Sequence, residues 1–344
     1  DIEKNIRVLE MAAETGAPVV TFYDSTGAKL EGGLDLLNAN ARLTAEIARV
    51  SGVVPQVAVV TGTCAGTNAI NAAAADVCVM AEDAELFLNA PFNAEDKVAN
   101  AGSAAFAAKA GVAAVTAADA VAAAKQAASI VALLPANNLA GPALFDFSAP
   151  SKALDLVKYT AADAVAALAD EGSAVELYAG YGKNVVTALA TINGSAVGIV
   201  ATEKKALCHK CTAKAARFVR LCDAYSIPVV TVVNTEGFGR SEGDDEAGGI
   251  RQAARMAGVY AEATTVTVLY KDEIFASDNI VNATKAKAAA YAKDVCSADA
   301  AVANGAADAV ADAATARGAV VQALDMLASK RAVRLAKKHG NITL

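Results

Sequence analysis

The chain carries the stretch Ala17-Pro18-Val19-Val20-Thr21-Phe22-Tyr23-Asp24-Ser25-Thr26-Gly27, and 210 residues later it carries Ile227-Pro228-Val229-Val230-Thr231-Val232-Val233-Asn234-Thr235-Glu236-Gly237. Pro, Val, Val, Thr and Gly are identical in the two copies, and the pairs Asp24/Asn234 and Ser25/Thr235 are close in chemistry. A segment with a helical pattern precedes each copy, at 8–14 and at 215–222. Each copy therefore predicts the same unit, which is a helix, a turn with proline, a buried strand and a glycine turn.

The same spacing continues downstream of the two copies. The apolar run at 57–60 falls opposite 267–270, and amphipathic helix candidates precede these runs at 43–50 and 250–263. Alternating helices and strands are typical of an α/β architecture with parallel strands. We therefore predict an α/β fold made of two similar halves, residues 1–145 and 146–344, which meet in a loop of prolines and asparagines at 133–150.

Three further segments favour helices. The alanine-dominated stretch 101–132 is predicted to be mostly helical because alanine has the highest helix propensity. Helices are also predicted at 277–292 and at 316–335, and the last of these has an apolar face and a basic end.

Composition excludes several classes of protein. The 344 residues are 55% hydrophobic and carry a formal net charge of −7, with no long run of lysine or arginine, which disfavours a nucleic-acid partner. The apolar excess comes largely from alanine, and no run of large apolar side chains is long enough to span a bilayer. The sequence begins at Asp1 with no visible signal peptide or start codon, so we expect a cytoplasmic protein whose polypeptide begins earlier.

Six cysteines are too few for a disulfide scaffold in a chain of this length, which favours a reducing compartment. Cys208-His209-Lys210-Cys211 has the spacing of half a zinc site, but the chain has no second Cys/His pair to complete four ligands. We therefore predict no metal site. A structural or incidental role is favoured for these cysteines, and metal or redox use remains the alternative.

The loop Gly62-Thr63-Cys64-Ala65-Gly66-Thr67-Asn68 lies between a predicted strand and a helix of small residues at 69–75. Such a turn directs backbone N–H groups and the positive end of a helix at one point, which suits an anion or a developing oxyanion. The turn at 24–28, after the neighbouring strand, could supply a second N–H group. A plain strand-to-helix turn is the alternative interpretation of these glycines.

The sequence contains no good pair of nucleophile and base. His209 and His339 are the only histidines, and neither lies in a glycine-rich loop. Cys64 could be activated by the helix end, but no histidine is near it in sequence. Catalysis by this chain would therefore depend on backbone amides.

The chain resembles the carboxyltransferase component of biotin-dependent acyl-CoA carboxylases and of sodium-pumping acyl-CoA decarboxylases. The matching stretches run in family order over nearly the whole chain, and they are 51–56, 62–66, 133–138, 181–194, 197–201, 214–225, 327–331 and 337–342. The resemblance implies two crotonase-like ββα-spiral halves in tandem, in agreement with the repeat. It also implies an enzyme that moves CO₂ between carboxybiotin and the α carbon of a small acyl-CoA thioester.

The resemblance also assigns residues to two sites that face each other across a dimer interface. Backbone amides at Gly27, Ala28, Ala65 and Gly66 would hold the thioester enolate in the first half, with Ser25, Thr26, Thr63 and Cys64 beside the substrate. The turn Glu236-Gly237-Phe238 would hold the biotin in the second half. The implied partners are a biotin carboxyl carrier protein or domain, a biotin carboxylase or membrane decarboxylase subunits that would associate the chain with a membrane, and further copies of the chain in a dimer or a hexamer.

Three features depart from the family pattern. The family has an additional section before residue 1, and Thr67 stands where a glycine is usual. A glycine loop should also follow the strand at 264–268, yet residues 271–279 contain no glycine where 61–69 contain two. The chain therefore either omits segments, which we favour because a missing helix would leave a hole in the core, or lacks the biotin-side oxyanion hole.

These departures define the alternative functions. A catalytically inactive scaffold that binds a biotin carrier or partner subunits would explain the missing loop. A crotonase-type hydratase or thioesterase is disfavoured because no placed acidic pair is evident.

Overall fold

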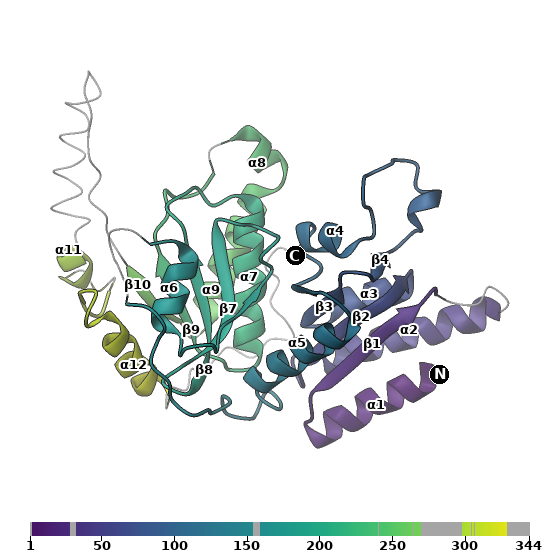
Figure 1. Ribbon diagram of the computed structural model, residues 1–344, viewed down its shortest axis with the longest axis horizontal. Helices are drawn as coiled ribbons and strands as arrows, with labels where there is room; N and C mark the ends of the chain where they lie inside the picture. The colour runs from purple at the N-terminus through teal and green to yellow at the C-terminus, as the bar shows by residue number, and fades with distance from the viewer. Residues whose placement is uncertain are drawn as a thin grey trace.

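The computed structural model describes residues 2–27, 32–153, 159–239, 241–263, 265–269, 298–303, 305 and 307–328. Two sheets lie side by side, and the first half of the chain builds one while the second half builds the other (Figure 1). In the described part of the chain, no helix is both long and apolar enough to cross a membrane.

The first sheet is parallel and has the order β1-β2-β3-β5, with β4 paired to the end of β2. Its strands are β1 (Val19–Ser25), β2 (Gln56–Ala65), β3 (Val77–Ala81), β4 (Glu85–Phe87) and β5 (Val115–Ala117). The helices of this half are α1 (Ile2–Thr15), α2 (Gly33–Val50), α3 (Thr67–Ala74), α4 (Ala104–Lys109) and α5 (Ala120–Leu133), with a short 3₁₀ turn, η2 (Pro91–Asn93). Strands β2 and β3 are almost wholly buried, as expected for a parallel sheet covered on both faces.

The second sheet is mixed and has the order β10-β9-β8-β7-β6. Its strands are β6 (Val175–Leu177), β7 (Val185–Ile192), β8 (Ser195–Thr202), β9 (Val229–Val233) and β10 (Thr265–Leu269). Strands β6, β7 and β8 pair antiparallel, whereas β8, β9 and β10 pair parallel. The helices of this half are α6 (Ala161–Leu168), α7 (His209–Ala224), α8 (Glu242–Glu246), α9 (Gly249–Glu262), α11 (Ala298–Ala303) and α12 (Ala316–Leu327).

The predicted repeat is present as a repeat of structure. The order α1-β1-α2-β2 recurs as α7-β9-α9-β10, and both strand pairs are parallel. Val19 lies opposite Gln56, and Val229 lies opposite Thr265, so the second unit is one residue shorter between its strands. The two strands of the repeated sequence thus occupy equivalent positions in their units.

The prediction of a mostly helical segment at 101–132 is wrong in its middle. Helix α4 ends before Gly111, which has φ +75°, and Val115 then pairs with Val79 in a parallel strand, β5. Pairing with a buried strand overrides the local helix propensity of alanine, because the sheet offers hydrogen bonds and burial together. The predicted helix at 277–292, and the part of the last helix beyond residue 328, lie outside the described residues.

The two halves pack against each other through polar contacts as well as apolar ones. One core cluster contains residues of β2, β3 and α5 from the first half and of α7 from the second. The buried Tyr225 hydroxyl donates to Val54 O at 2.9 Å and lies 2.7 Å from the Asp76 carboxylate. The Arg217 guanidinium reaches the carbonyls of Ala73 and Ala75 at the end of α3, where the helix dipole favours a cation.

Candidate active site

The acyl side of the predicted site lies where β1 and β2 end. Tyr23 pairs with Val60, but Ser25 pairs with Cys64, so β2 has three residues opposite Asp24 alone. This bulge turns the end of β2 toward the turn after β1. A Cβ atom on Gly62 would collide with the Asp24 carboxylate, so a larger residue there would displace the Asp24 side chain from its present position.

The turn after β1 lies beside the end of β2. Gly27 has φ +109°, and its N–H donates to Ser25 Oγ at 3.3 Å. A Cβ atom built on Gly27 would lie 3.9 Å from Ala65 O, which places the two predicted loops in van der Waals reach. Ser25 and Thr26 are exposed to solvent, and Ala28 lies outside the described residues. The structure therefore brings together the two glycine turns that the sequence analysis selected.

Helix α3 begins directly at the second loop. Gly66 precedes the helix with φ +61° and ψ −127°, a conformation that is open essentially to glycine alone. Its N–H donates to Phe87 O at 3.0 Å. Among the residues that the structure describes, no acceptor is found for the N–H groups of Thr67 and Asn68. These amides and the positive helix end form the open donor edge of the loop.

The cysteine beside this edge is buried and unreactive. Cys64 is fully buried, and burial together with neighbouring Cys78 raises the pKa of its thiol to about 12. A thiol with this pKa stays protonated at neutral pH and is a poor nucleophile. Thr63 is half-buried and pairs with Glu85 of β4. The site thus offers backbone donors and no activated nucleophile.

The biotin side of the predicted site is the turn after β9. Gly237 has φ +97°, its N–H donates to Thr235 Oγ1 at 3.2 Å, and its carbonyl accepts from the N–H of Leu207 at 2.9 Å. Glu236 and Phe238 are exposed, and Phe238 retains 54% of its surface. Bonds to the segment before α7 therefore fix the backbone of this turn, while its outer side chains remain free.

The two turns share one internal bond. In each, the hydroxyl of Ser25 or Thr235 accepts from the N–H of the glycine two residues later. Sequence analysis noted the similarity of Ser25 and Thr235 but did not assign them this role. The sequence did carry a signal for this bond, because a hydroxyl residue, any residue and then glycine follow both strands.

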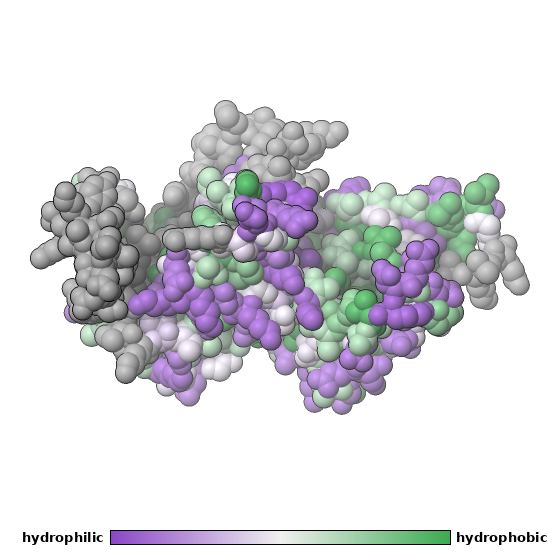
Figure 2. All heavy atoms as spheres, turned by 90° about the horizontal axis from the view of Figure 1, so that it is seen from above, coloured by the Kyte–Doolittle hydropathy of each residue, from purple (hydrophilic) through white to green (hydrophobic). Residues whose placement is uncertain are grey.

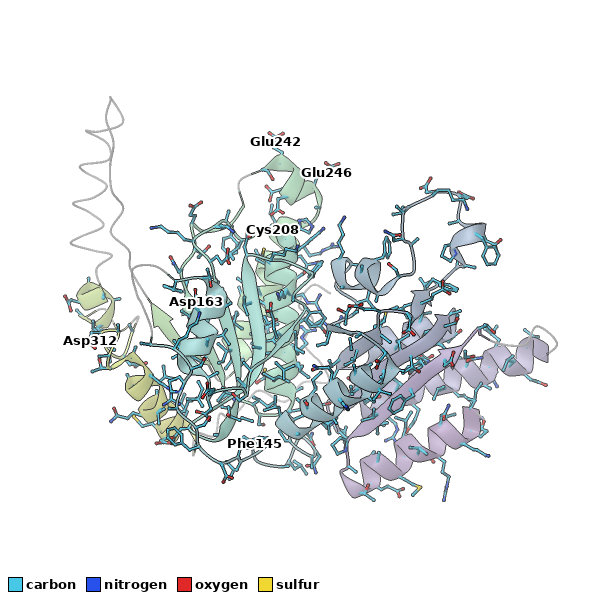
Figure 3. The ribbon with its side chains drawn as sticks, in the orientation of Figure 1. Phe145, Asp163, Cys208, Glu242, Glu246 and Asp312 are labelled. Carbon is cyan, nitrogen blue, oxygen red and sulfur yellow. The ribbon has the colours of Figure 1, made fainter. Side chains whose placement is uncertain are left out.

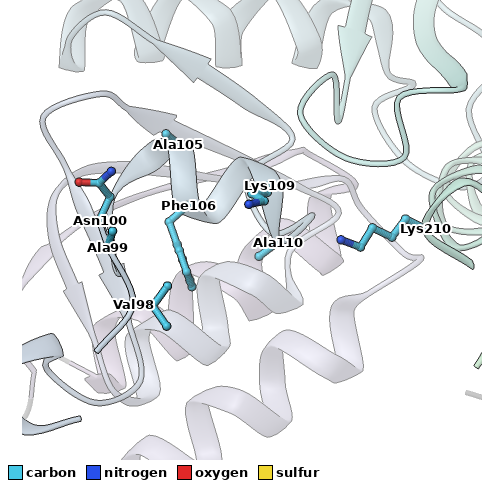
Figure 4. Close-up of a pocket in the computed structure, with 8 residues that line it drawn as sticks. All are labelled: Val98, Ala99, Asn100, Ala105, Phe106, Lys109, Ala110 and Lys210. Carbon is cyan, nitrogen blue, oxygen red and sulfur yellow. The ribbon is translucent and has the colours of Figure 1, made fainter. Parts of the chain in front are cut away.

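A groove lies between the two halves, near the start of α7. It has a volume of about 400 Å³ and is lined by Val98, Ala99, Asn100, Ala105, Phe106, Lys109, Ala110 and Lys210 (Figure 4). Lys109 comes from α4 and Lys210 from α7, so each half contributes one cation to a mostly apolar groove. None of the predicted site residues lines it. Within the described ranges, no three His, Cys, Asp or Glu side chains gather as they would around a metal ion.

The carboxyl transferase domain family matches residues 1–270. The chain belongs to this family. It is 32% identical to the methylmalonyl-CoA carboxyltransferase 12S subunit of Propionibacterium freudenreichii subsp. shermanii, over 98% of this chain and 77% of the relative. It is 30% identical to the methylmalonyl-CoA decarboxylase subunit alpha of Veillonella parvula, over 99% of this chain and 79% of the relative.

The structural comparison agrees with the sequence comparison. The crystal structure of transcarboxylase 12S, a hexamer with methylmalonyl-coenzyme A bound, matches with a TM-score of 0.87 and 29% identity, over 100% of this chain and 79% of that one. The predicted fold of two crotonase-like halves and the predicted enzyme class, a biotin-dependent acyl-CoA carboxyltransferase, are confirmed. An inactive scaffold is not favoured.

The family alignment also bears on the departures noted in the sequence. The match to the Propionibacterium relative extends over 403 positions, whereas the chain has 344 residues, so at least 59 aligned positions have no counterpart here. The chain is therefore shorter than this relative within the matched region. The glycine loop expected after β10 would fall at residues outside the described part of the chain.

Proposed function

We propose that this carboxyltransferase moves a carboxyl group between carboxybiotin on a carrier protein and the α carbon of a three-carbon acyl-CoA, with methylmalonyl-CoA and propionyl-CoA as the two substrate states. The named relatives act on methylmalonyl-CoA.

Loss of the carboxyl group leaves an electron pair that is delocalised over the α carbon and the thioester oxygen as an enolate. The site must therefore stabilise a negative oxygen, and it needs no covalent nucleophile.

The observation that carries the proposal is the meeting of the Gly27 turn with the start of α3. The open amides of Thr67 and Asn68 point out of a helix end beside that turn. The Gly66 N–H is already bonded to Phe87 O. We therefore propose that Ala65 and Gly66 shape the loop and that the N–H groups of the next two residues donate to the substrate. The thioester oxygen would lie against this edge, next to Ser25, Thr26, Thr63 and Cys64.

The biotin would lie against the turn Glu236-Gly237-Phe238 of the second half. The exposed Phe238 ring offers an apolar face to the bicyclic biotin ring, and the rigid backbone of the turn fixes its position. Residues 1–145 would then be the acyl-CoA side and residues 146–344 the biotin side. The biotin carrier protein or domain is the proposed partner of this surface.

The two turns belong to different halves, so we propose that a complete site forms between two copies of the chain. Transcarboxylase 12S is a hexamer, which makes a homo-oligomer the matching assembly here. Light scattering at micromolar concentration should show at least a dimer, and a monomer would contradict this arrangement. A biotin carboxylase or membrane decarboxylase subunits would be the further partners, according to the direction of the reaction.

The direct test replaces Gly66 with valine. A Cβ atom there would project into open space in front of the loop and would also force a strained backbone. We expect kcat for carboxybiotin-dependent labelling of propionyl-CoA to fall by roughly 10²–10³, because a distorted loop would displace the Thr67 and Asn68 amides and such a loss follows when one oxyanion donor no longer acts. Gly66→Ala and a circular dichroism spectrum show whether the fold survives.

Cys64→Ala is the matched control in the same loop. Its thiol has no covalent part in this proposal, so the loss in kcat should stay below about tenfold, as expected for a packing change without loss of a donor. Full activity in folded Gly66→Val, or loss of activity confined to Cys64→Ala, would overturn the backbone-amide mechanism in favour of thiol catalysis.

A further inference from the structure

Cys208 and Cys211 lie at the start of α7, close enough to react with each other. Their Sγ atoms are 3.0 Å apart, and both cysteines are free thiols. Cys208 is the N-cap residue of this 16-residue helix, and Cys211 is one turn further along it. The two thiols therefore lie on one side of a helix start, a geometry in which a disulfide closes without large backbone movement.

The two thiols differ in environment. Cys208 is partly exposed, beneath α8, which carries the exposed Glu242 and Glu246 (Figure 3). Cys211 is buried, and its burial, together with the contact to Cys208, raises the pKa of its thiol to about 11. A reagent in solution therefore meets Cys208 first. Cys211 lies 3.0 Å from the sulfur that it would attack, and this proximity compensates for the small thiolate fraction that its raised pKa leaves. An accessible thiol that reacts first and a second thiol that then closes the disulfide are typical of reactive cysteine pairs at helix starts.

The pair is connected to the biotin-side turn through its neighbours in the chain. Leu207, directly before Cys208, donates its N–H to Gly237 O and accepts from Gly239 N–H, both at 2.9 Å. His209, directly after Cys208, bonds Asp244 of α8 through its N–H at 2.9 Å and through Nδ1 at 2.6 Å. Movement of residue 208 is thereby transmitted to both ends of the segment 237–244.

We propose that Cys208 and Cys211 form a reversible disulfide in reaction with a low-molecular-weight disulfide, and that this bond lowers carboxyl transfer by displacing the biotin-side turn. The Cys208 thiolate attacks one sulfur of the reagent and releases one thiol. The Cys211 thiolate then attacks Cys208 in the mixed disulfide and releases the second thiol. Two cysteine thiols are oxidised and one reagent disulfide is reduced to two thiols, with one proton passing from each cysteine to solvent or to the released thiolate.

The effect on the turn follows from the geometry of the product. The Sγ atoms of a disulfide lie about 2.05 Å apart, closer than in the dithiol form. Closing the bond requires rotation of both side chains and a small adjustment of residue 208, and the two Leu207 bonds carry that adjustment to Gly237 and Gly239. The regulatory part of this inference rests on the proposed function of that turn, whereas disulfide formation itself does not.

The experiment uses the full chain with oxidised glutathione as reagent, followed by dithiothreitol. Mass spectrometry of alkylated peptides should show that residues 208 and 211 lose both free thiols and together lose two hydrogens. Carboxyl transfer to propionyl-CoA should fall by at least about fivefold and recover on reduction. Hydrogen exchange of the peptide containing 234–239 should change between the two states, a readout that does not depend on activity.

Cys208→Ser is the matched variant, because serine keeps the N-cap and the approximate size of the side chain. It should have the reduced protein's activity, and neither its rate nor its hydrogen exchange should respond to oxidised glutathione. Retention of both thiols in the wild type, or glutathione remaining on Cys208, overturns the proposal. A disulfide that changes neither the rate of carboxyl transfer nor hydrogen exchange at 234–239 overturns the regulatory part of the proposal. If the reduced chain has no carboxyl transfer activity, the proposed function fails, and hydrogen exchange alone tests the displacement of the turn.

Discussion

Strands β1 and β9 both begin with Val-Val-Thr and lie in two different environments. Val20 and Phe22 of β1 are 39% and 57% exposed, whereas the corresponding Val230 and Val232 of β9 are fully buried. In the second half, β8 pairs along the other edge of β9, and Val230 and Val232 share a core cluster with residues of α6 and α12. In the described part of the first half, β1 pairs with β2 alone. The same local sequence therefore folds into the same strand whether or not one face is covered.

Surface composition shows the same difference. Large apolar side chains such as Leu34, Leu37 and Phe92 are exposed in the first half. Seen from above, the strongly hydrophobic side chains lie mostly over the first half, at right, whereas the visible surface of the second half is more polar (Figure 2). Contacts with further copies of the chain in the proposed oligomer would reduce this exposed apolar area.

The strongest test of the comparison places a charge at the same position of each repeat. Val230→Asp would bury an unpaired carboxylate and should cost more than about 4 kcal/mol of the free energy of unfolding. Val20→Asp leaves the carboxylate in water and should cost less than about 0.5 kcal/mol. Urea unfolding of both variants measures the difference. An equal loss in Val20→Asp would mean that the outer face of β1 is covered in solution.

A second test concerns the residues that end the repeated helices. Tyr225, after α7, bonds the first half through Val54 O and Asp76, whereas the corresponding Thr15 of α1 bonds its own helix and no other described segment. Tyr225→Phe should cost about 1–3 kcal/mol, because it leaves buried acceptors with fewer donors. Thr15→Val should cost less than about 0.5 kcal/mol. Thermal and urea unfolding distinguish the two.

This loss should depend on pH. Burial raises the pKa of Asp76 above its ordinary value of 3.8, although the bond from Tyr225 opposes that shift. A raised pKa in the folded state means that stability falls as pH rises from 3.8 through the folded pKa. Tyr225→Phe removes the opposing bond and raises this pKa further. The loss should therefore be larger at pH 7 than at pH 4, and equal losses at both would contradict the role of Asp76.

The smallest expected effects come from the hydroxyls in the two turns. Thr235 Oγ1 accepts from Gly237 N–H and also donates to Lys205 O at 2.9 Å, whereas Ser25 Oγ, among the residues that the structure describes, makes the single bond to Gly27. Thr235→Val should cost about 1 kcal/mol and Ser25→Ala less than about 0.5 kcal/mol. Melting temperatures measure stability, and the KM for carboxybiotin should rise only in Thr235→Val. A rise in both variants would show that the two turns do not act separately.

Much of the fold was predictable because it is encoded over short distances. The units at 17–27 and 227–237 each hold their turn by a bond between residues two apart, and the helices and strands around them follow local hydrophobic patterns. The segment 101–132 shows the limit of such patterns. Its alanines favour a helix everywhere, and only pairing with β3 selects Val115–Ala117 as a strand.

The candidate site was predictable in its parts and not in its arrangement. Gly27, Gly62 and Gly66 were recognisable as turn residues, but the collision that a side chain at Gly62 would cause depends on Asp24 of another strand. That Gly66 N–H bonds Phe87, leaving Thr67 and Asn68 as open donors, depends on the position of β4. These contacts join segments whose separation in the chain carries no periodic signal.

The sequence by itself determined that the chain contains two copies of one helix, strand and turn unit, because the helix and the turn of each copy bond within a few residues and the strand follows a local apolar pattern. The tertiary structure decided which copy is covered, which turn is held by Leu207 and which amides remain open. Burial and hydrogen-bond partners at those positions come from β4, β8, α6 and α12, which the chain brings together only after folding. Similar local sequence therefore yields a strand with exposed side chains in one half and a buried core strand in the other.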